Sequence, residues 1–206
     1  MSVAFKKATK EQAKLRMAIH GPAGSGKTFS ALSIAKGLCE KVAVLDTEHG
    51  SASKYSDTFD FDVVEITENY HPDRIIETID AALEAGYECL IIDSMTHFWN
   101  GPGGFLSLVD EEAKRSGKTE NTFTAWKKVD PIYKRVVQHI LSSPLHVIVT
   151  ARAKQAYELT KDERGKNRVE KLGMSPELRE GFQYELDIEA MLDMDHNLVI
   201  GKTRCQ

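Results

Sequence analysis

Residues 20–28 read HGPAGSGKT and contain the pattern G-x-x-x-x-G-K-[ST], which constrains the fold more than any other stretch of this chain. Glycines at the fixed positions let successive backbone N–H groups point at phosphate oxygens, because no Cβ blocks the turn or the ligand. Residues 14–20 before the motif predict a strand, and residues 28–38 after it predict a helix with Leu32, Ala35 and Leu38 facing inward. A glycine-rich turn that only joins a strand to a helix is the alternative. The full motif in this context indicates the phosphate-binding loop of a nucleotide-binding protein.

The contacts expected with a nucleotide come from the loop backbone, from the helix N-terminus and from two side chains. Lys27 supplies positive charge to the β and γ phosphates, and the Thr28 hydroxyl is expected to ligate Mg²⁺. We therefore predict ATP and Mg²⁺ as the cofactors. The predicted binding residues are Gly21, Pro22, Ala23, Gly24, Ser25, Gly26, Lys27, Thr28 and Phe29.

Composition limits the other classes of protein and site. Of the 206 residues, 41% are hydrophobic and 28% are charged, which is ordinary for a soluble globular protein. No apolar run approaches the ~20 residues of a membrane span, and residues 1–10 lack an apolar signal core, so we expect a cytoplasmic protein without a membrane partner. The three cysteines and seven histidines lack zinc-ligand spacing. A net charge of −4 means that any contact with nucleic acid must come from local patches.

Strand and helix patterns alternate along the chain, which predicts the α/β fold class with a mainly parallel sheet flanked by helices. Strands are expected at residues 14–20, 42–45, 62–66, 88–93 and 145–152, with two antiparallel C-terminal strands at 184–192 and 197–204. Helices are expected at residues 28–38, 71–86, 105–115 and 131–143, and a short one at 175–182 with Ser175 as its cap. The predicted organisation is a basic N-terminal arm over residues 1–16 and one ATPase domain over residues 17–206.

Acidic residues follow two of the predicted buried strands. Asp46 and Glu48 come after residues 42–45, and Asp93 ends residues 88–93. Open α/β sheets place their ligand sites at the carboxyl ends of parallel strands. A carboxylate there, downstream of a phosphate loop, is suited to holding a metal-bound water, so Asp93 is the predicted second magnesium residue. An ordinary acid at the end of a strand is the alternative for Asp93.

The segment 152–171 is strongly charged, with a turn expected near residues 163–167. A solvated hairpin and a loop that contacts phosphates are both consistent with this pattern. Its positive residues are Arg152, Lys154, Lys161, Arg164, Lys166, Arg168 and Lys171.

The phosphate loop, VAVLDTEHG at residues 42–50 and LIIDSMT at residues 90–96 resemble, in this order and at these intervals, the RecA-like recombinase ATPases. The combination is most similar to small phage-encoded members, including Sak-type single-strand annealing proteins and the related phage AAA-family ATPases. The resemblance extends from about Lys14 to Arg204. It implies a RecA-like P-loop core in which Glu48 aims the water that attacks the γ-phosphate, while Asp93 and Thr28 hold Mg²⁺. A solvated loop acid is the alternative for Glu48.

The resemblance also implies roles for residues further along the chain. Thr150 or Arg152 would sense the γ-phosphate at the start of a DNA-binding loop over residues 152–171, in which Tyr157 could stack on a base. Lys202 and Arg204 resemble paired basic residues that reach the nucleotide of a neighbouring protomer. Residues two apart on a strand share a face, so both charges could point at one phosphate. An exposed basic strand end is the alternative.

The function expected from these residues is ATP hydrolysis coupled to single-stranded DNA in phage recombination or annealing. The protein would form homo-oligomeric rings or filaments, and a single-strand DNA-binding protein is a further candidate partner. A P-loop phosphotransferase, with Arg152, Arg164 and Arg168 as a lid over the phosphates, is a second reading. A third is a DNA-annealing module that uses ATP only as a switch. Glu48 favours water activation, which a kinase must avoid.

A first prediction concerns assembly. Residues Phe5 to Ala8 fit the F-x-x-A pattern by which some recombinases dock an N-terminal arm on the next protomer's sheet, although packing on its own domain would also use these residues. If the arm joins protomers, Phe5→Glu should dissolve the oligomers and leave ATP binding intact, because a charge would replace the buried ring. Light scattering measures the particle size, and an unchanged size would contradict the docking role.

Overall fold

Continuous apolar runs form the centre of one sheet because helices cover both of its faces. The computed structural model describes residue 7 and residues 13–115, 122–161 and 167–205. These residues form an eight-stranded sheet with the order β3-β2-β4-β5-β1-β7-β8, and β6 pairs with β5 outside this path. Buried parallel strands fill the centre, as predicted: β1 (Arg16–Gly21), β2 (Val42–Asp46), β4 (Cys89–Asp93) and the first half of β5 (His146–Lys161).

The two edges of the sheet differ in direction. On one edge, the exposed strand β3 (Asp62–Glu65) pairs in parallel with β2. On the other edge, β7 (Ile188–Leu192) runs parallel to β1, and β8 (Leu198–Thr203) is antiparallel to β7. The predicted fold class, a mainly parallel sheet with antiparallel C-terminal strands, is therefore confirmed.

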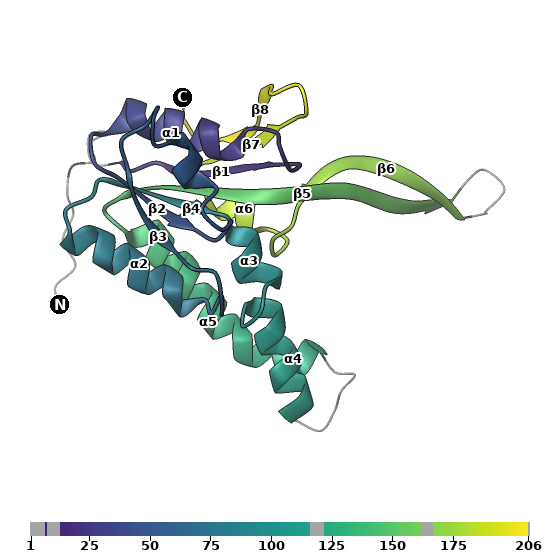
Figure 1. Cartoon of the computed structure of the whole chain (residues 1–206). Helices are drawn as coiled ribbons and strands as arrows, with labels where there is room; N and C mark the ends of the chain where they lie inside the picture. Colours follow the sequence, from purple (N-terminus) through teal and green to yellow (C-terminus); the bar gives the residue numbers. More distant parts are fainter. Residues whose placement is uncertain (1–6, 8–12, 116–121, 162–166, 206) are drawn as a thin grey trace.

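Figure 1 shows α1 (Lys27–Leu38) on one face of the sheet, with α2 (Asp73–Glu84) and α5 (Thr122–Ser142) on the other. Neighbouring strand residues face opposite layers: Ile91 packs in the cluster with α1, whereas Leu90 packs with α2 and α5. In α1 the prediction was right for Leu32 and Ala35, which are buried, and wrong for Leu38. Leu38 is the last residue of the helix and is 42% exposed.

The helices between β4 and β5 depart most from the prediction. The expected helix α4 (Phe105–Arg115) is present, and α3 (Met95–Asn100) is additional, as is the 3₁₀ turn η2 (Ala52–Tyr55) between β2 and β3. Helix α5 begins at Thr122 and not at Pro131, which lies inside it. The turns before Pro131 pack firmly, because Ala125 and Val129 are buried and Trp126 stacks on Trp99 with ring centroids 5.7 Å apart. This burial outweighs the preference of proline for a helix start.

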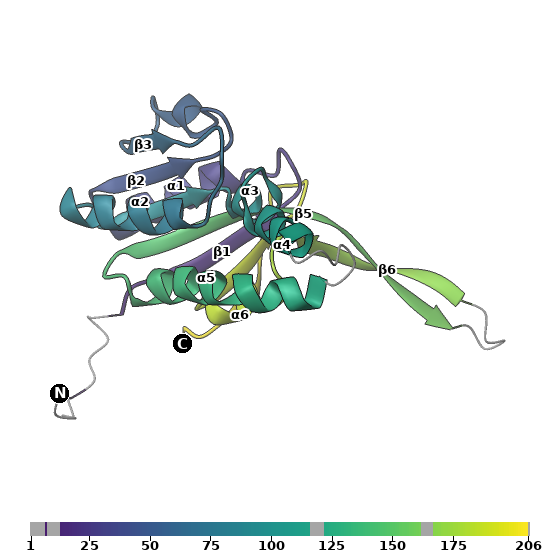
Figure 2. The same cartoon turned by 90° about the horizontal axis from the view of Figure 1, so that it is seen from below.

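A two-stranded antiparallel ribbon projects from the body, as Figures 1 and 2 show. The second half of β5 pairs with β6 (Asn167–Pro176), with Lys154 opposite Ser175 and Ala153 opposite Pro176. The helix predicted at residues 175–182 is therefore wrong, and only a short α6 (Phe182–Glu185) follows. The strand pairing of Ser175 with Lys154 outweighs the preference of this serine for a helix cap. The segment 152–171 is a hairpin, while residues 162–166 at its end lie outside the described residues.

Arg16 is the first residue of β1 and not part of a solvated basic arm. Its side chain is buried and donates hydrogen bonds to the carbonyl oxygens of Leu15 (2.9 Å), Leu145 (2.5 Å) and Ser143. These bonds satisfy backbone groups where α5 ends and β5 begins. Burial lowers the pKa of the guanidinium, and Asp187 opposes that change. Arg16 therefore joins β1 to the neighbouring strand and helix.

Arg16→Ala should lower the free energy of unfolding by about 3 kcal/mol, because it leaves several buried carbonyl oxygens without donors. Urea unfolding followed by circular dichroism measures this change. Arg74→Ala is the matched control, because Arg74 forms an exposed pair with Glu77 and its loss should cost less than about 0.5 kcal/mol. Equal destabilisation by the two variants would contradict this role of Arg16.

Candidate nucleotide and magnesium site

The phosphate loop joins β1 to α1, and its glycines meet three different requirements. A Cβ at Gly21 would lie 2.5 Å from the Leu192 carbonyl oxygen and 2.7 Å from Ser25 Oγ, so the loop packs directly on β7. Gly24 has φ 80° and Gly26 has φ 94°, which other residues rarely adopt. The space beside Gly24 is open, as a phosphate-binding backbone requires.

Lys27 is the first residue of α1, and its side chain folds back onto the phosphate loop. Its Nζ donates hydrogen bonds to the carbonyl oxygens of Gly21 (3.1 Å) and Pro22 (2.8 Å). Burial lowers the pKa of the ammonium, and the nearby carboxylates of Asp93 and Glu48 partly offset this change. The ammonium therefore faces both the loop and the acidic residues at the strand ends.

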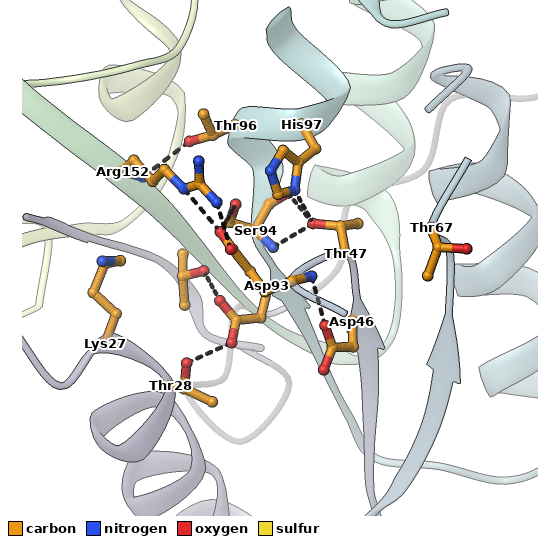
Figure 3. Close-up of polar contacts among 12 residues, drawn as sticks. Lys27, Thr28, Asp46, Thr47, Thr67, Asp93, Ser94, Thr96, His97 and Arg152 are labelled. Carbon is orange, nitrogen blue, oxygen red and sulfur yellow. Dashed lines mark hydrogen bonds and ion pairs between the residues drawn. The ribbon is translucent and has the colours of Figure 1, made fainter. Parts of the chain in front are cut away.

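Asp93 ends β4 between two threonine hydroxyls. Thr28 Oγ1 donates to Oδ2 at 2.6 Å, and Thr150 Oγ1 donates to Oδ1 at 2.5 Å. Figure 3 shows Thr28 and Asp93 in contact below Arg152. Burial raises the pKa of Asp93 and the charges of Asp46 and Glu48 raise it further, while the two hydroxyls lower it. The predicted pair of magnesium residues is thus brought together.

Glu48 is positioned by the turn that follows β2. The carboxylate of Asp46 accepts hydrogen bonds from the backbone N–H groups of Glu48 (2.6 Å) and Ala52 (2.9 Å). Arg152 binds the Glu48 carboxylate through Nε (3.0 Å) and Nη2 (2.5 Å), and the Ser94 hydroxyl donates to it at 3.0 Å. Burial alone would raise the pKa of Glu48, but the contacts with Arg152 and Ser94 outweigh burial and lower it.

A second layer, which the sequence did not predict, holds these strand ends in place. Thr47 Oγ1 accepts a hydrogen bond from the Ser94 N–H (2.8 Å) and contacts His97 Nδ1 (2.8 Å). The His97 ring stacks on Tyr70 with centroids 5.1 Å apart, and burial lowers the pKa of the imidazole. Figure 3 shows Thr47, Ser94 and His97 beside Asp93. A neutral imidazole here orients the residues that flank Glu48.

The donor set fits magnesium better than a metal held by protein ligands alone. Thr28 and Asp93 present one hydroxyl and one carboxylate at hydrogen-bond distance from each other. In the described part of the chain, no group of three or more histidine, cysteine or acidic side chains could hold a metal ion. Mg²⁺ is usually bound by one or two protein oxygens, several waters and the phosphates of a substrate. Thr28 and Asp93 supply such a pair.

Beside the loop lies a cavity of about 590 Å³. Residues 24–30 line it, together with Ser51, Tyr55 and His196, which the sequence had not indicated. His196 lies in the turn between β7 and β8, and its Nδ1 is 3.0 Å from the Ser25 carbonyl oxygen. The two strands that this turn joins were predicted, but the place of the turn was not: β7 pairs with β1, which brings the turn to the phosphate loop. Phe29 lines this cavity and is 47% exposed.

The structure separates Lys202 and Arg204 from the other predicted site residues. Lys202 Nζ donates to the carbonyl oxygens of Tyr184 and Leu186, both at 2.6 Å, and Arg204 Nη2 donates to that of Tyr184 at 2.8 Å. The shared Tyr184 carbonyl agrees with the expectation that the two side chains point the same way. They lie where β8 pairs with the beginning of β7, away from the phosphate loop of the same chain. Their action on a neighbouring protomer stays a prediction.

A family model described as an AAA domain matches residues 13–205. The chain belongs to this family. No curated protein matches the sequence of this AAA-domain protein. In a comparison with solved structures, the AAA-domain protein is similar to the crystal structure of the RadB recombinase, with 15% sequence identity and a TM-score of 0.51.

The alignment with the RadB recombinase covers 91% of this chain and 80% of that chain. At this identity the similarity shows the fold alone, and that fold is the RecA-like P-loop core expected from the motifs. The family and the phosphate loop together indicate a nucleotide-binding protein. None of the helices in the described ranges has the length and apolar character to cross a membrane.

Asp93→Asn should weaken Mg²⁺-dependent nucleotide binding while preserving or increasing stability. Because burial raises the pKa of Asp93 in the folded state, its charged form opposes folding at neutral pH, and this cost disappears as the carboxyl is protonated at lower pH. Removing the charge should therefore raise the melting temperature at pH 7, which differential scanning calorimetry measures.

Calorimetric titration with ATP, with and without Mg²⁺, should show a loss of about tenfold or more in the Mg²⁺-dependent affinity of Asp93→Asn. The exposed Asp60→Asn should change neither the melting temperature nor the affinity. A lower melting temperature for Asp93→Asn would mean that its charge supports the fold instead of the site.

Proposed function

We propose that this AAA-domain protein hydrolyses ATP with Mg²⁺ and couples the reaction to single-stranded DNA. The proposal depends on one observation. At the carboxyl ends of the central strands, beside an open phosphate loop, lie Lys27, Thr28, Asp93 and Glu48. Mg²⁺, when bound, neutralises phosphate charge and orients the triphosphate. The loop amides and Lys27 hold the phosphates, and Thr28 and Asp93 are the residues that would hold the metal.

Glu48 is the residue proposed to orient the attacking water. Its lowered pKa keeps the side chain ionised at neutral pH, so it can accept a hydrogen bond from water. In-line attack on a phosphoryl group depends more on holding and aiming the water than on removing its proton beforehand. The turn built on Asp46 fixes the backbone of Glu48 for that purpose.

Arg152 is a better candidate than Thr150 for sensing the γ-phosphate. The Thr150 side chain is fully buried and donates to Asp93, which supports its role as a positioning residue for the magnesium carboxylate. The Arg152 side chain is 44% exposed and lies beside Glu48 at the start of the ribbon. An exposed guanidinium can bind phosphate oxygens through two parallel hydrogen bonds.

The ribbon of β5 and β6 is the proposed contact with single-stranded DNA. It begins directly after Arg152, and the sequence from residue 152 to 171 carries seven positive residues. Basic side chains can follow a phosphate backbone, and an aromatic residue such as Tyr157 can stack on bases. The Tyr157 side chain lies outside the described ones. The likeness of the motifs to phage annealing proteins supports a role in recombination or annealing in the host cytoplasm.

Assembly into rings or filaments is also part of the proposal. Both edge strands expose apolar side chains: Val63 and Val64 on β3, and Val199 and Ile200 on β8. Exposed sheet edges can pair with a second chain. Of the predicted arm over residues 1–16, Arg16 belongs to β1 of the domain, and the residues before it are proposed as a separate arm, although Phe5 and Ala8 lie outside the described residues. Lys202 and Arg204 would act across the interface, and a single-strand DNA-binding protein would supply the DNA.

The central test is ATP turnover with and without single-stranded DNA. Wild-type turnover should rise when DNA is added, and Glu48→Gln should reduce it by about 10²-fold or more while ATP binding is retained, because the amide no longer holds the water as a carboxylate does. Phosphate release measures the rate. Glu65→Gln is the matched control, because Glu65 is an exposed acid at the end of the neighbouring strand β3.

Turnover that is independent of DNA and survives Glu48→Gln would contradict the proposed ATPase mechanism. DNA binding controlled by ATP, without turnover in the wild type, would favour an annealing module that uses ATP as a switch. Transfer of phosphate to a small acceptor would favour the phosphotransferase.

A further inference from the structure

Arg152 and Glu48 have opposite charges and bind each other directly. The guanidinium contacts both carboxylate oxygens, through Nε to Oε1 and through Nη2 to Oε2. Ser94 donates a third hydrogen bond, to Oε1. A carboxylate has about four acceptor positions, so most of the capacity of Glu48 is already used. In this arrangement Glu48 has little capacity left for an attacking water.

The backbone of Arg152 is fixed although its side chain is accessible. Its N–H donates to Thr96 Oγ1 at 2.9 Å, and its carbonyl oxygen accepts a hydrogen bond from the Glu177 N–H at 2.7 Å. These contacts hold the residue to α3 and to the chain that follows β6. The side chain is the part of Arg152 that can exchange one anion for another.

The anion expected beside Arg152, a terminal phosphate, is a stronger partner for arginine than a carboxylate. Lys27 lies at the same end of the central strands, and Figure 3 shows Lys27, Asp93 and Arg152 there. Besides the dominant effect of burial, the charges of Glu48 and Arg152 act in opposite directions on the pKa of Lys27, so the three groups share one electrostatic environment. A terminal phosphate carries more negative charge than a carboxylate and also fits two parallel N–H donors.

We infer that the Arg152–Glu48 ion pair is a lock on the resting site, which a nucleotide with a γ-phosphate opens by taking Arg152 away from Glu48. Glu48 is then free to hold the water, and the pair forms again when the γ-phosphate has left. This inference rests on the proposed function. It assigns to Arg152 a second role, since the residue that senses the γ-phosphate also withholds the water-orienting carboxylate until that phosphate is bound.

The test is a double-mutant cycle on nucleotide preference, which needs no turnover. For the wild type, Glu48→Gln, Arg152→Gln and the double variant, calorimetry measures the affinities for ADP and for a non-hydrolysable ATP analogue, each with Mg²⁺. Glu48→Gln removes repulsion of the γ-phosphate in either background, but it weakens the lock only where Arg152 is present. Glu48→Gln should therefore raise the ratio of the affinity for the ATP analogue to the affinity for ADP in both backgrounds. The increase should be about fivefold larger when Arg152 is present than in the Arg152→Gln background, which is the effect expected from a half-exposed bidentate ion pair.

An equal gain in both backgrounds would overturn the lock and leave the proposed ATPase function standing, because Glu48 would then act by repulsion alone. Wild-type protein that binds neither nucleotide would overturn the proposed function and the lock together. Glu65→Gln should leave the preference unchanged, and ADP affinities that agree among the variants would show that the phosphate loop is intact. A Glu65→Gln effect as large as that of Glu48→Gln would also contradict the lock, because it would show a general effect of charge.

Discussion

The candidate site depends on one buried carboxylate held between two hydroxyls. Asp93 accepts hydrogen bonds from Thr28 on α1 and from Thr150 on β5, so it joins the phosphate loop helix to two central strands. A buried charge is expensive unless it is hydrogen-bonded, and both of its oxygens have donors here. The alignment of the phosphate loop with the other strand ends follows from this contact. The site is therefore part of the central packing of the domain and not an addition on flexible loops.

Around that carboxylate, the other charged side chains of the site have partners within the protein. Glu48 is bound to Arg152, and Lys27 is bound to the carbonyl oxygens of its own loop. Each of these charged groups thus has a partner within the protein, and the two cations, Lys27 and Arg152, can exchange their present partners for phosphate oxygens. Separated charges in a half-buried site would destabilise the fold. The internal partners let the site remain folded and polar until an anion replaces them.

Much of the fold could be predicted because the central strands are continuous apolar runs, and because the phosphate loop has a fixed strand and helix beside it. The predicted elements were wrong where a local sequence preference is outweighed by a contact with residues distant in the sequence. Pro131 resembled a helix start, but α5 begins earlier, at Thr122, because Ala125 and Val129 are buried. Ser175 resembled a helix cap, but pairing with Lys154 places it in β6.

The motif residues of the site could likewise be predicted, whereas their partners could not. Glu48 and Arg152 are 104 positions apart in the chain, and their contact follows from the order of the strands. His196 reaches the phosphate loop because β7 lies beside β1, which no local pattern near His196 indicates. Arg16 was misplaced for the same reason, since the carbonyl oxygens that it binds belong to residues about 130 positions away.

Strand β5 continues through two very different surroundings without a break. Up to Arg152 it lies between β1 and β4 in the interior, and beyond that residue its ladder is with β6 alone. A two-stranded ribbon is marginally stable by itself, whereas central strands open only when the whole domain unfolds. Amide protons along this one strand should therefore exchange with solvent deuterium on two separate timescales. The change from slow to fast exchange should fall at the residue that binds Glu48, so the outer strand could fray and close again while the interior stays intact.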